Sequence, residues 1–308
     1  MPTYQTQLGR PRKAELRMVL FLFFAAGFFL FQLPGLAQEQ EEGEFKGAGI
    51  HLRLRGAWTM FSGGDLKNGV QGMYDQTAAK ILDMGYETVS SDEEKLNSGT
   101  EITGDVIYYF TPRLGVGLGG GWLWARRDSI FRFRPPDAVL NYMMTSSPKL
   151  DVTSVRLGVF YTLPLGRVLA VTLNAGPAYY FADFQYGKST QIPIYVDSMI
   201  LKGKANDLGL EGGIGLLIRM NRRLDFVIEA QGRLAKVSGF DGKQQLYRVI
   251  EGVPVIDSVA EGPLSYVERD GLPRLEIFPD GSPPGLSVKD AALDLSGVSF
   301  QAGLNFKF

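Results

Sequence analysis

The chain has 308 residues, of which 45% are hydrophobic and 21% are charged. This composition excludes a disordered tail and a helical membrane bundle. The net charge of −1 excludes a strongly basic protein, so no nucleic-acid partner is expected. The absence of cysteine excludes a disulfide framework, a thiolate zinc site and a lipid anchor on cysteine.

The N-terminal segment has the features of a cleavable export signal. Four basic residues precede an apolar run at 18–31, which is shorter than the roughly 20 residues that a membrane-spanning helix needs. Small residues follow at 35–37, and this order is typical of a secretory signal. We therefore expect residues 1–37 to be removed. The remaining domain, 38–308, would begin with a periplasmic extension at 38–47.

Beyond this segment, apolar residues recur at every second position, which is the period of a β-strand with two different faces. At 114–125, for example, Val116 and Leu118 flank Gly117. The eight segments with this pattern lie at 50–60, 101–110, 114–125, 152–163, 169–181, 207–218, 224–234 and 298–308. A soluble periplasmic barrel would have a polar outer face, whereas one face is apolar in all eight segments.

The connections between these segments alternate between short and long. Tight turns are predicted at 111–113, 164–167 and 221–223, where proline, glycine or asparagine occurs. The long connections run over 62–100, 128–151, 187–205 and 237–293. Short turns at one end and long loops at the other predict an all-β fold: a closed, antiparallel, eight-stranded transmembrane barrel with up-and-down topology.

Two long connections carry local signals of their own. Apolar residues between Leu66 and Ile81 recur at helical spacing, so a short amphipathic helix is expected in the first. The fourth contains three Asp-Gly pairs, at 241–242, 270–271 and 280–281, each typical of a tight turn. We expect 249–259 and 266–278 to form a hairpin above the membrane. A ten-stranded barrel, with this hairpin in the membrane, remains open.

Outward-facing aromatic residues gather near the segment ends, as expected at the two lipid interfaces. They are Trp58, Tyr108, Phe110, Trp122, Trp124, Tyr161, Tyr179, Phe181 and Phe226.

The pattern resembles the small eight-stranded outer-membrane barrels, the group of the OmpA transmembrane domain, OmpX and OmpW. The most characteristic stretches lie at 108–122, 174–181 and 298–308. In that group a terminal aromatic residue with alternating apolar residues before it is read by the barrel-insertion machinery. Here the matching residues are Phe300, Ala302, Leu304, Phe306 and Phe308. The resemblance also implies periplasmic chaperones as partners, and outer-membrane lipid with lipopolysaccharide as surroundings.

The inward face carries charges that should pair, because a lone buried charge costs several kcal/mol. They are Arg53, Arg55, Asp105, Arg156, Glu211, Glu229 and Arg233. A structural ion-pair network is the favoured interpretation, and a gate or selectivity constriction is the alternative. Arg53 and Asp105, on adjacent strands, are the preferred pair.

Glycines are frequent on the inward face of the third and sixth segments. They are Gly115, Gly117, Gly119, Gly121, Gly209, Gly213 and Gly215. Large residues such as Phe160 and Tyr180 could fill the space that they leave. If they do not, a narrow lumen remains.

His51 is the only histidine, and it lies near the predicted short-turn end. Barrel enzymes that act on lipid A use histidine, serine and an acid near the long-loop end. Neither that arrangement nor a histidine-based metal site is available, so no catalytic residue, metal or cofactor is expected.

We therefore expect a non-enzymatic outer-membrane protein with both termini in the periplasm. Its long loops would make surface contacts and its wall would support the envelope. The ligand-binding residues and the loop partner stay unknown. An OmpW-like narrow pore for small or hydrophobic solutes is the alternative.

Overall fold

The computed structural model describes residues 48–136, 141–192, 195–250, 253–279 and 287–308. The predicted signal peptide (1–37), the extension at 38–47 and the Asp-Gly pair at 280–281 lie outside the described residues. The elements belong to the unit Phe45–Lys307. Within the described part of the chain, no helix is both long and apolar enough to cross a membrane.

Strands make up most of the described chain. In order, the elements are β1 (Gly49–Phe61), α2 (Gly64–Asp83), β2 (Glu87–Asp92), β3 (Ser98–Tyr109), β4 (Leu114–Arg126), β5 (Ser129–Arg134), β6 (Tyr142–Pro164), β7 (Leu169–Ile192), β8 (Tyr195–Arg219), β9 (Leu224–Val237), β10 (Asp241–Ile250), β11 (Val253–Arg269), β12 (Leu272–Ile277), β13 (Val288–Asp290), β14 (Leu293–Asp294) and β15 (Gly297–Lys307).

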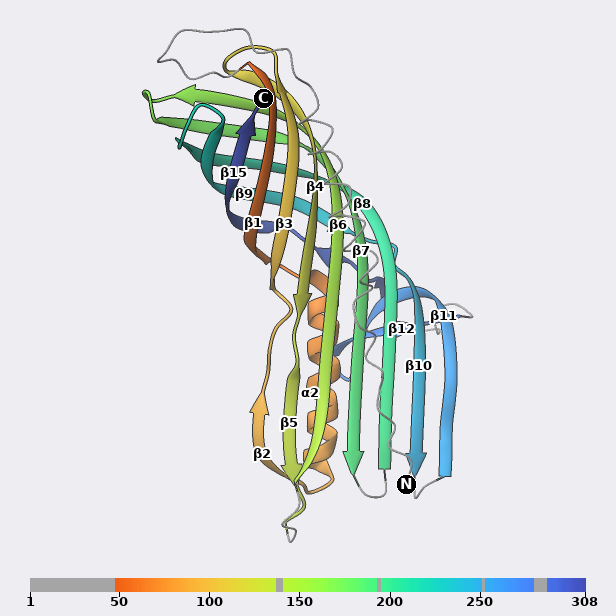
Figure 1. Ribbon diagram of the computed structural model, residues 1–308. Coiled ribbons are helices and arrows are strands. Elements are labelled where there is room, and N and C mark those ends of the chain that lie inside the picture. Colours follow the sequence, from red (N-terminus) through yellow and green to blue (C-terminus); the bar gives the residue numbers. More distant parts are fainter. Residues whose placement is uncertain (1–47, 137–140, 193–194, 251–252, 280–286) are drawn as a thin grey trace. The chain divides into compact units, whose positions relative to one another are not determined.

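Eight strands form a closed ring in the order β1, β3, β4, β6, β7, β8, β9 and β15 (Figure 1). Each pairs antiparallel with both neighbours. The ring closes between β15 and β1, from His51 opposite Lys307 to Phe61 opposite Gly297. The predicted eight-stranded barrel is confirmed. The ten-stranded alternative is wrong, because β10 and β11 pair outside the ring.

The outer face of the ring is apolar. Leu118, Leu208 and Leu234 are 60%, 64% and 69% exposed, because successive side chains of a strand point to opposite faces. An exposed apolar surface of this extent, running around a closed barrel, is stable where lipid covers it.

Tight turns join the ring strands at one end, as predicted. In the first, the Thr111 hydroxyl accepts hydrogen bonds from the backbone amides of Arg113 and Leu114. The start of β1 lies beside this turn, with Gly49 opposite Tyr109. The end of β15 lies at the same end of the ring, because the Lys307 amide donates to the carbonyl of Arg223 in the third turn.

Past the other end of the ring, β6, β7 and β8 continue as a second, open sheet. They run for 23, 24 and 25 residues. β5 and β2 pair beyond β6, while β10 and β11 pair beyond β8 (Figure 1). We call this part, the described residues of 64–96, 127–148, 184–204 and 239–292, the extension.

The extension corrects the prediction of long loops. The alternating pattern continues through them, since Met144, Ser146 and Leu150 are all buried on β6. On β8, Met199 and Leu201 are buried within the predicted loop at 187–205. The predicted segments therefore ended too early, because the alternation beyond them uses more polar residues.

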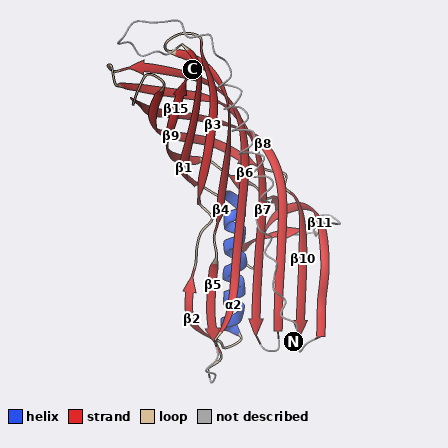
Figure 2. Ribbon diagram, viewed as in Figure 1, coloured by secondary structure: helices blue, strands red, loops and turns tan. Residues whose placement is uncertain are grey.

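The predicted helix is confirmed as α2, and it packs into the extension (Figure 2). One side of the helix meets β12 at Gly69 and Gly72. A Cβ on Gly72 would overlap the carbonyl oxygen of Pro273. Another side places Tyr74 and Ile81 in one apolar cluster with Phe133. The glycines thus let the helix approach β12 closely while its larger residues fill the sheet side.

Gly72→Ala is expected to destabilise the extension by about 1–3 kcal/mol, because the added methyl group must displace backbone. The comparison is Asn68→Ala, at an exposed position of the same helix. Limited proteolysis of the refolded protein should release fragments of the extension faster in the first variant alone. Equal cleavage of both variants would show that the close packing at Gly72 is not needed.

The fourth long connection forms two hairpins rather than the one expected. β10 pairs with the first part of β11, and the last part of β11 pairs with β12. The predicted turn at Asp270-Gly271 is confirmed between β11 and β12, where Asp270 has a φ of 55° and Gly271 a φ of 73°. Asp241-Gly242 begins β10 and is not a hairpin turn. The segment 266–278 therefore pairs within itself as the second hairpin, whereas the described residues of 249–259 belong to the first hairpin of β10 and β11.

A lysine is largely buried under α2 in the extension. The Lys188 ammonium donates to the Thr77 hydroxyl at 3.1 Å and lies 3.5 Å from the Asp197 carboxylate. Burial lowers the pKa of Lys188 below its ordinary value, and the nearby charges of Lys80 and Arg248 lower it further, although Asp197 opposes the shift.

This shift predicts a pH dependence of the extension. Because the folded form binds the Lys188 proton less tightly than the unfolded form, stability should rise as the pH increases from the lowered pKa towards the ordinary one. Urea unfolding at a series of alkaline pH values should show the rise in the wild type, and Lys188→Met should flatten it. An identical slope in both proteins would contradict the prediction.

Candidate functional site: the charged interior of the ring

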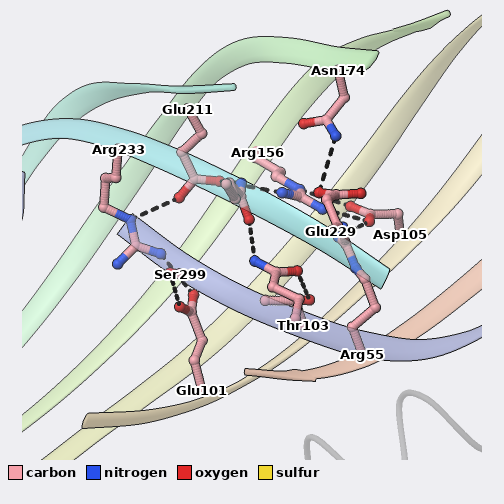
Figure 3. A network of polar contacts seen from close by, with 12 residues as sticks. Arg55, Glu101, Thr103, Asp105, Arg156, Asn174, Glu211, Glu229, Arg233 and Ser299 are labelled. Atoms are coloured by element: carbon pink, nitrogen blue, oxygen red, sulfur yellow. Dashed lines mark hydrogen bonds and ion pairs between the residues drawn. The ribbon is translucent and has the colours of Figure 1, made fainter. Parts of the chain in front are cut away.

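The seven predicted inward charges all lie inside the ring. Their exposed fractions run from 0% for Arg53 to 8% for Glu211. They come from five strands, since β1 supplies two, β3, β6 and β8 one each, and β9 two. Figure 3 labels six of them, all but Arg53, and shows these six gathered in the interior.

The Glu229 carboxylate holds two arginines of β1. Arg53 Nη1 lies 3.2 Å from Oε2, and Arg55 Nη1 lies 2.6 Å from Oε1. Asn174 Nδ2 donates to Oε1 at 3.0 Å (Figure 3). Both oxygens of this buried carboxylate are therefore occupied.

Asp105 connects Glu229 to the far wall of the ring. Arg55 and Arg156 both bind Asp105 Oδ2, and Arg156 Nε donates to Oδ1 at 2.7 Å. Arg156 Nη1 also reaches Glu211 Oε2 at 3.3 Å. Two arginines thus bridge three carboxylates.

Among the carboxylates of the network, Glu211 has the most side-chain partners, and Arg156 is one of them. Arg233 Nε lies 3.1 Å from Oε1, Tyr180 donates its hydroxyl to the same oxygen at 2.5 Å, and Gln231 donates to Oε2 at 2.7 Å. Arg233 Nη2 then binds Glu101 Oε1 at 2.8 Å. Glu101 was not among the predicted charges, although its position two residues before Thr103 on β3 gives it the same inward parity.

The result is one chain of alternating charges. It runs Arg53, Glu229, Arg55, Asp105, Arg156, Glu211, Arg233 and Glu101. Four guanidinium groups balance four carboxylates, so none of these buried charges is left without an opposite charge beside it.

The preferred pair of the sequence analysis is corrected. Arg53 lies opposite Asp105 in the β1–β3 register, but its ion pair is with Glu229. The reason is that Arg55 and Arg156 already occupy Asp105. The Arg53 guanidinium instead lies over the Phe160 ring, 5.5 Å from its centroid.

The inward glycines make room for this network. A Cβ on Gly119 would overlap Asp105, and one on Gly213 would come within 2.9 Å of Glu229 Oε1. Phe160 lies against Gly117, and Tyr180 against Gly209. Both aromatic residues thus fill space beside glycines, as proposed for them from the sequence.

Side chains also fill the interior on either side of the network. At the short-turn end, Asp225 accepts from Asn305 at 3.0 Å and binds Lys307 at 2.6 Å. His51 lies there as predicted, buried, with its ring centroid 4.6 Å from that of Tyr109. At the extension end, an apolar cluster continues from Tyr180 into the extension. Its members include Phe61, Leu66, Leu96, Leu123, Val237, Leu293 and Leu295.

The proposed insertion residues lie on the last strand. Phe300 and Leu304 are exposed on the outer face of β15, and Phe306 shares that face. Phe308 follows the strand and is 50% exposed. Their role in insertion stays a prediction. Among the described residues, no group of three or more histidine and acidic side chains is placed to hold a metal ion.

Comparison with known proteins identifies the fold. The profile of the outer membrane protein beta-barrel domain matches residues 23–248. The chain belongs to this family. Its place in the outer membrane therefore follows from both the family and the apolar outer wall of the ring.

Two solved structures are similar to the chain. The outer membrane protein OprG from Pseudomonas aeruginosa is 13% identical, with 86% of this chain and 99% of that one covered at a TM-score of 0.39. Ail, the attachment invasion locus protein of Yersinia pestis, is 13% identical, with 85% and 99% covered at a TM-score of 0.29. No curated protein matches the chain.

Proposed function

We propose that this outer-membrane barrel is a non-enzymatic anchor that holds the extension outside the cell and supports the envelope. The observation that carries the proposal is the filled interior, where a neutral ion-pair chain is followed by an apolar cluster at the extension end. Such an interior gives a rigid wall.

The orientation follows the usual asymmetry of these barrels, in which short turns face the periplasm and long connections face outward. The start of β1 and the end of β15 both lie at the short-turn end. We therefore propose that both termini are periplasmic. The extension has a packed apolar core, which includes Phe184 and Leu201. It can therefore present a folded surface to a partner.

The absence of cysteine allows a direct test of this orientation. Single cysteines would replace Ala79, exposed on α2, and Arg167, exposed in a short turn. A membrane-impermeant maleimide added to intact cells should label Ala79→Cys and leave Arg167→Cys unlabelled until the outer membrane is permeabilised. Labelling of Arg167→Cys in intact cells would overturn the proposed orientation.

The narrow pore is the competing function. It requires a continuous water path through the ring, and the ion pairs of Arg55, Arg156 and Arg233 link β1, β3, β6, β8 and β9 inside it. Opening a path would break several of these buried pairs, each costly to separate.

A further inference from the structure

A row of basic residues crosses the outer face of the sheet where the ring meets the extension. The strand register places Arg126 opposite Lys149, Lys149 opposite Gln185, and Gln185 opposite Lys202. Lys202 in turn lies opposite Lys243. Residues opposite one another in a sheet point to the same face, so these side chains form one outward row.

The first two cations of this row lie directly beyond an aromatic band. On β4, Trp122 and Trp124 precede Arg126 on the same face, with ring centroids 4.8 Å apart. Further toward the short turns the face becomes purely apolar, as at Leu118 opposite Leu157. Because strands rise about 3.4 Å per residue, Arg126 lies roughly 7 Å beyond Trp124. Tryptophan marks the membrane interface, so this is the level of lipid headgroups.

Arg126 and Lys149 are like charges placed directly opposite one another, an arrangement that destabilises a sheet unless an anion compensates it. Neither side chain forms an ion pair with a described residue. Neighbouring lysines do, since Lys204 binds Asp183 at 3.0 Å and Lys243 binds Glu261 at 2.7 Å.

The nearest acidic position on the same face is Asp151, two residues along β6 from Lys149 and opposite Trp124. Asp183, opposite Asp151 on β7, is paired with Lys204, so a single further carboxylate beside two cations leaves positive charge at this point of the wall.

We propose that Arg126 and Lys149 together bind a phosphate group of an outer-leaflet lipid. The planar guanidinium can donate two parallel hydrogen bonds to phosphate oxygens, and the ammonium adds a point charge beside it. Trp124 would contact the apolar part of the same lipid. The inference rests on the proposed orientation, which puts this end of the ring in the outer leaflet.

The test compares lipid retention by four forms of the full chain in nanodiscs of phosphatidylcholine containing a minor fraction of lipid A. The forms are the wild type, Arg126→Gln/Lys149→Gln, the charge-preserving Arg126→Lys/Lys149→Arg, and Arg113→Gln/Arg167→Gln. The last removes two exposed charges at the short-turn end. Native mass spectrometry counts bound lipid A, and a parallel series uses lipid A without phosphates.

The neutralised pair should bind phosphorylated lipid A roughly tenfold or more weakly than wild type, since each basic residue near a lipid surface contributes about 1 kcal/mol. The charge-preserving and short-turn variants should retain it, and removal of the phosphates should abolish the difference. Equal retention by the neutralised pair, or equal loss in the short-turn variant, would overturn the site. A reversed orientation would instead appear in the maleimide labelling, so the two failures are distinguishable.

Discussion

Glu229→Gln is expected to destabilise the folded barrel by about 3–5 kcal/mol, the cost of removing one partner from a buried ion pair. The substitution keeps the shape of the side chain and the hydrogen bond from Asn174, but removes the charge that holds Arg53 and Arg55. Both guanidinium groups would then be buried beside a neutral amide. Urea unfolding of the protein refolded into lipid vesicles measures the change.

The matched control is Glu261→Gln, which removes the same charge from an exposed pair with Lys243 in the extension. Exposed pairs of this kind contribute about 0–1 kcal/mol, so its unfolding midpoint should stay near that of the wild type. If Glu229→Gln is no more destabilising than Glu261→Gln, the interior must be hydrated, and the ion-pair chain does not hold the ring together.

Phe184→Ala is expected to cost about 3–5 kcal/mol, because it leaves a cavity in a packed core. Phe184 is fully buried in the apolar cluster that joins the ring to the extension. The loss should appear in the unfolding of the ring as well as of the extension, since β7 runs through both. Tryptophan fluorescence reports on the ring, and limited proteolysis reports on the extension.

Gln185→Ala is the control for this substitution, because Gln185 follows Phe184 on the same strand and points to the opposite, half-exposed face. It should change stability by less than about 0.5 kcal/mol. If the chain were flexible beyond the predicted segment at 169–181, neither substitution would have much effect. A large effect of Phe184→Ala on the ring requires one continuous core.

The ring could be predicted from the sequence because its chemistry repeats at every second residue. The period of two alone places Arg55, Asp105 and Glu229 on one face, and closure of the barrel then brings them together. The choice of partners could not be predicted. It depends on how far each side chain reaches across the ring, and on which carboxylate a neighbour has already occupied, as Arg53 shows.

The extension could be predicted only in fragments. Two local signals are sufficient to predict parts of it. The helical spacing around Val70 and Met73 predicts α2, and the Asp270-Gly271 pair predicts the turn of one hairpin. The continuation of β6 to β8 could not be predicted, because residues such as Pro148 and Lys188 interrupt the apolar pattern. Proline removes a backbone donor and usually marks the end of a strand. Pairing with β5 and β10 keeps these strands extended nevertheless.

The most direct test of the filled interior is single-channel conductance of the full chain in a planar bilayer, with insertion verified by labelling of Ala79→Cys on the same sample. The buried chain from Arg53 to Glu101 and the apolar cluster beyond it predict a silent membrane. Reproducible conductance steps that change in Glu229→Gln would contradict this result. They would show that ions pass the network, and the narrow pore would then be the better description of this barrel.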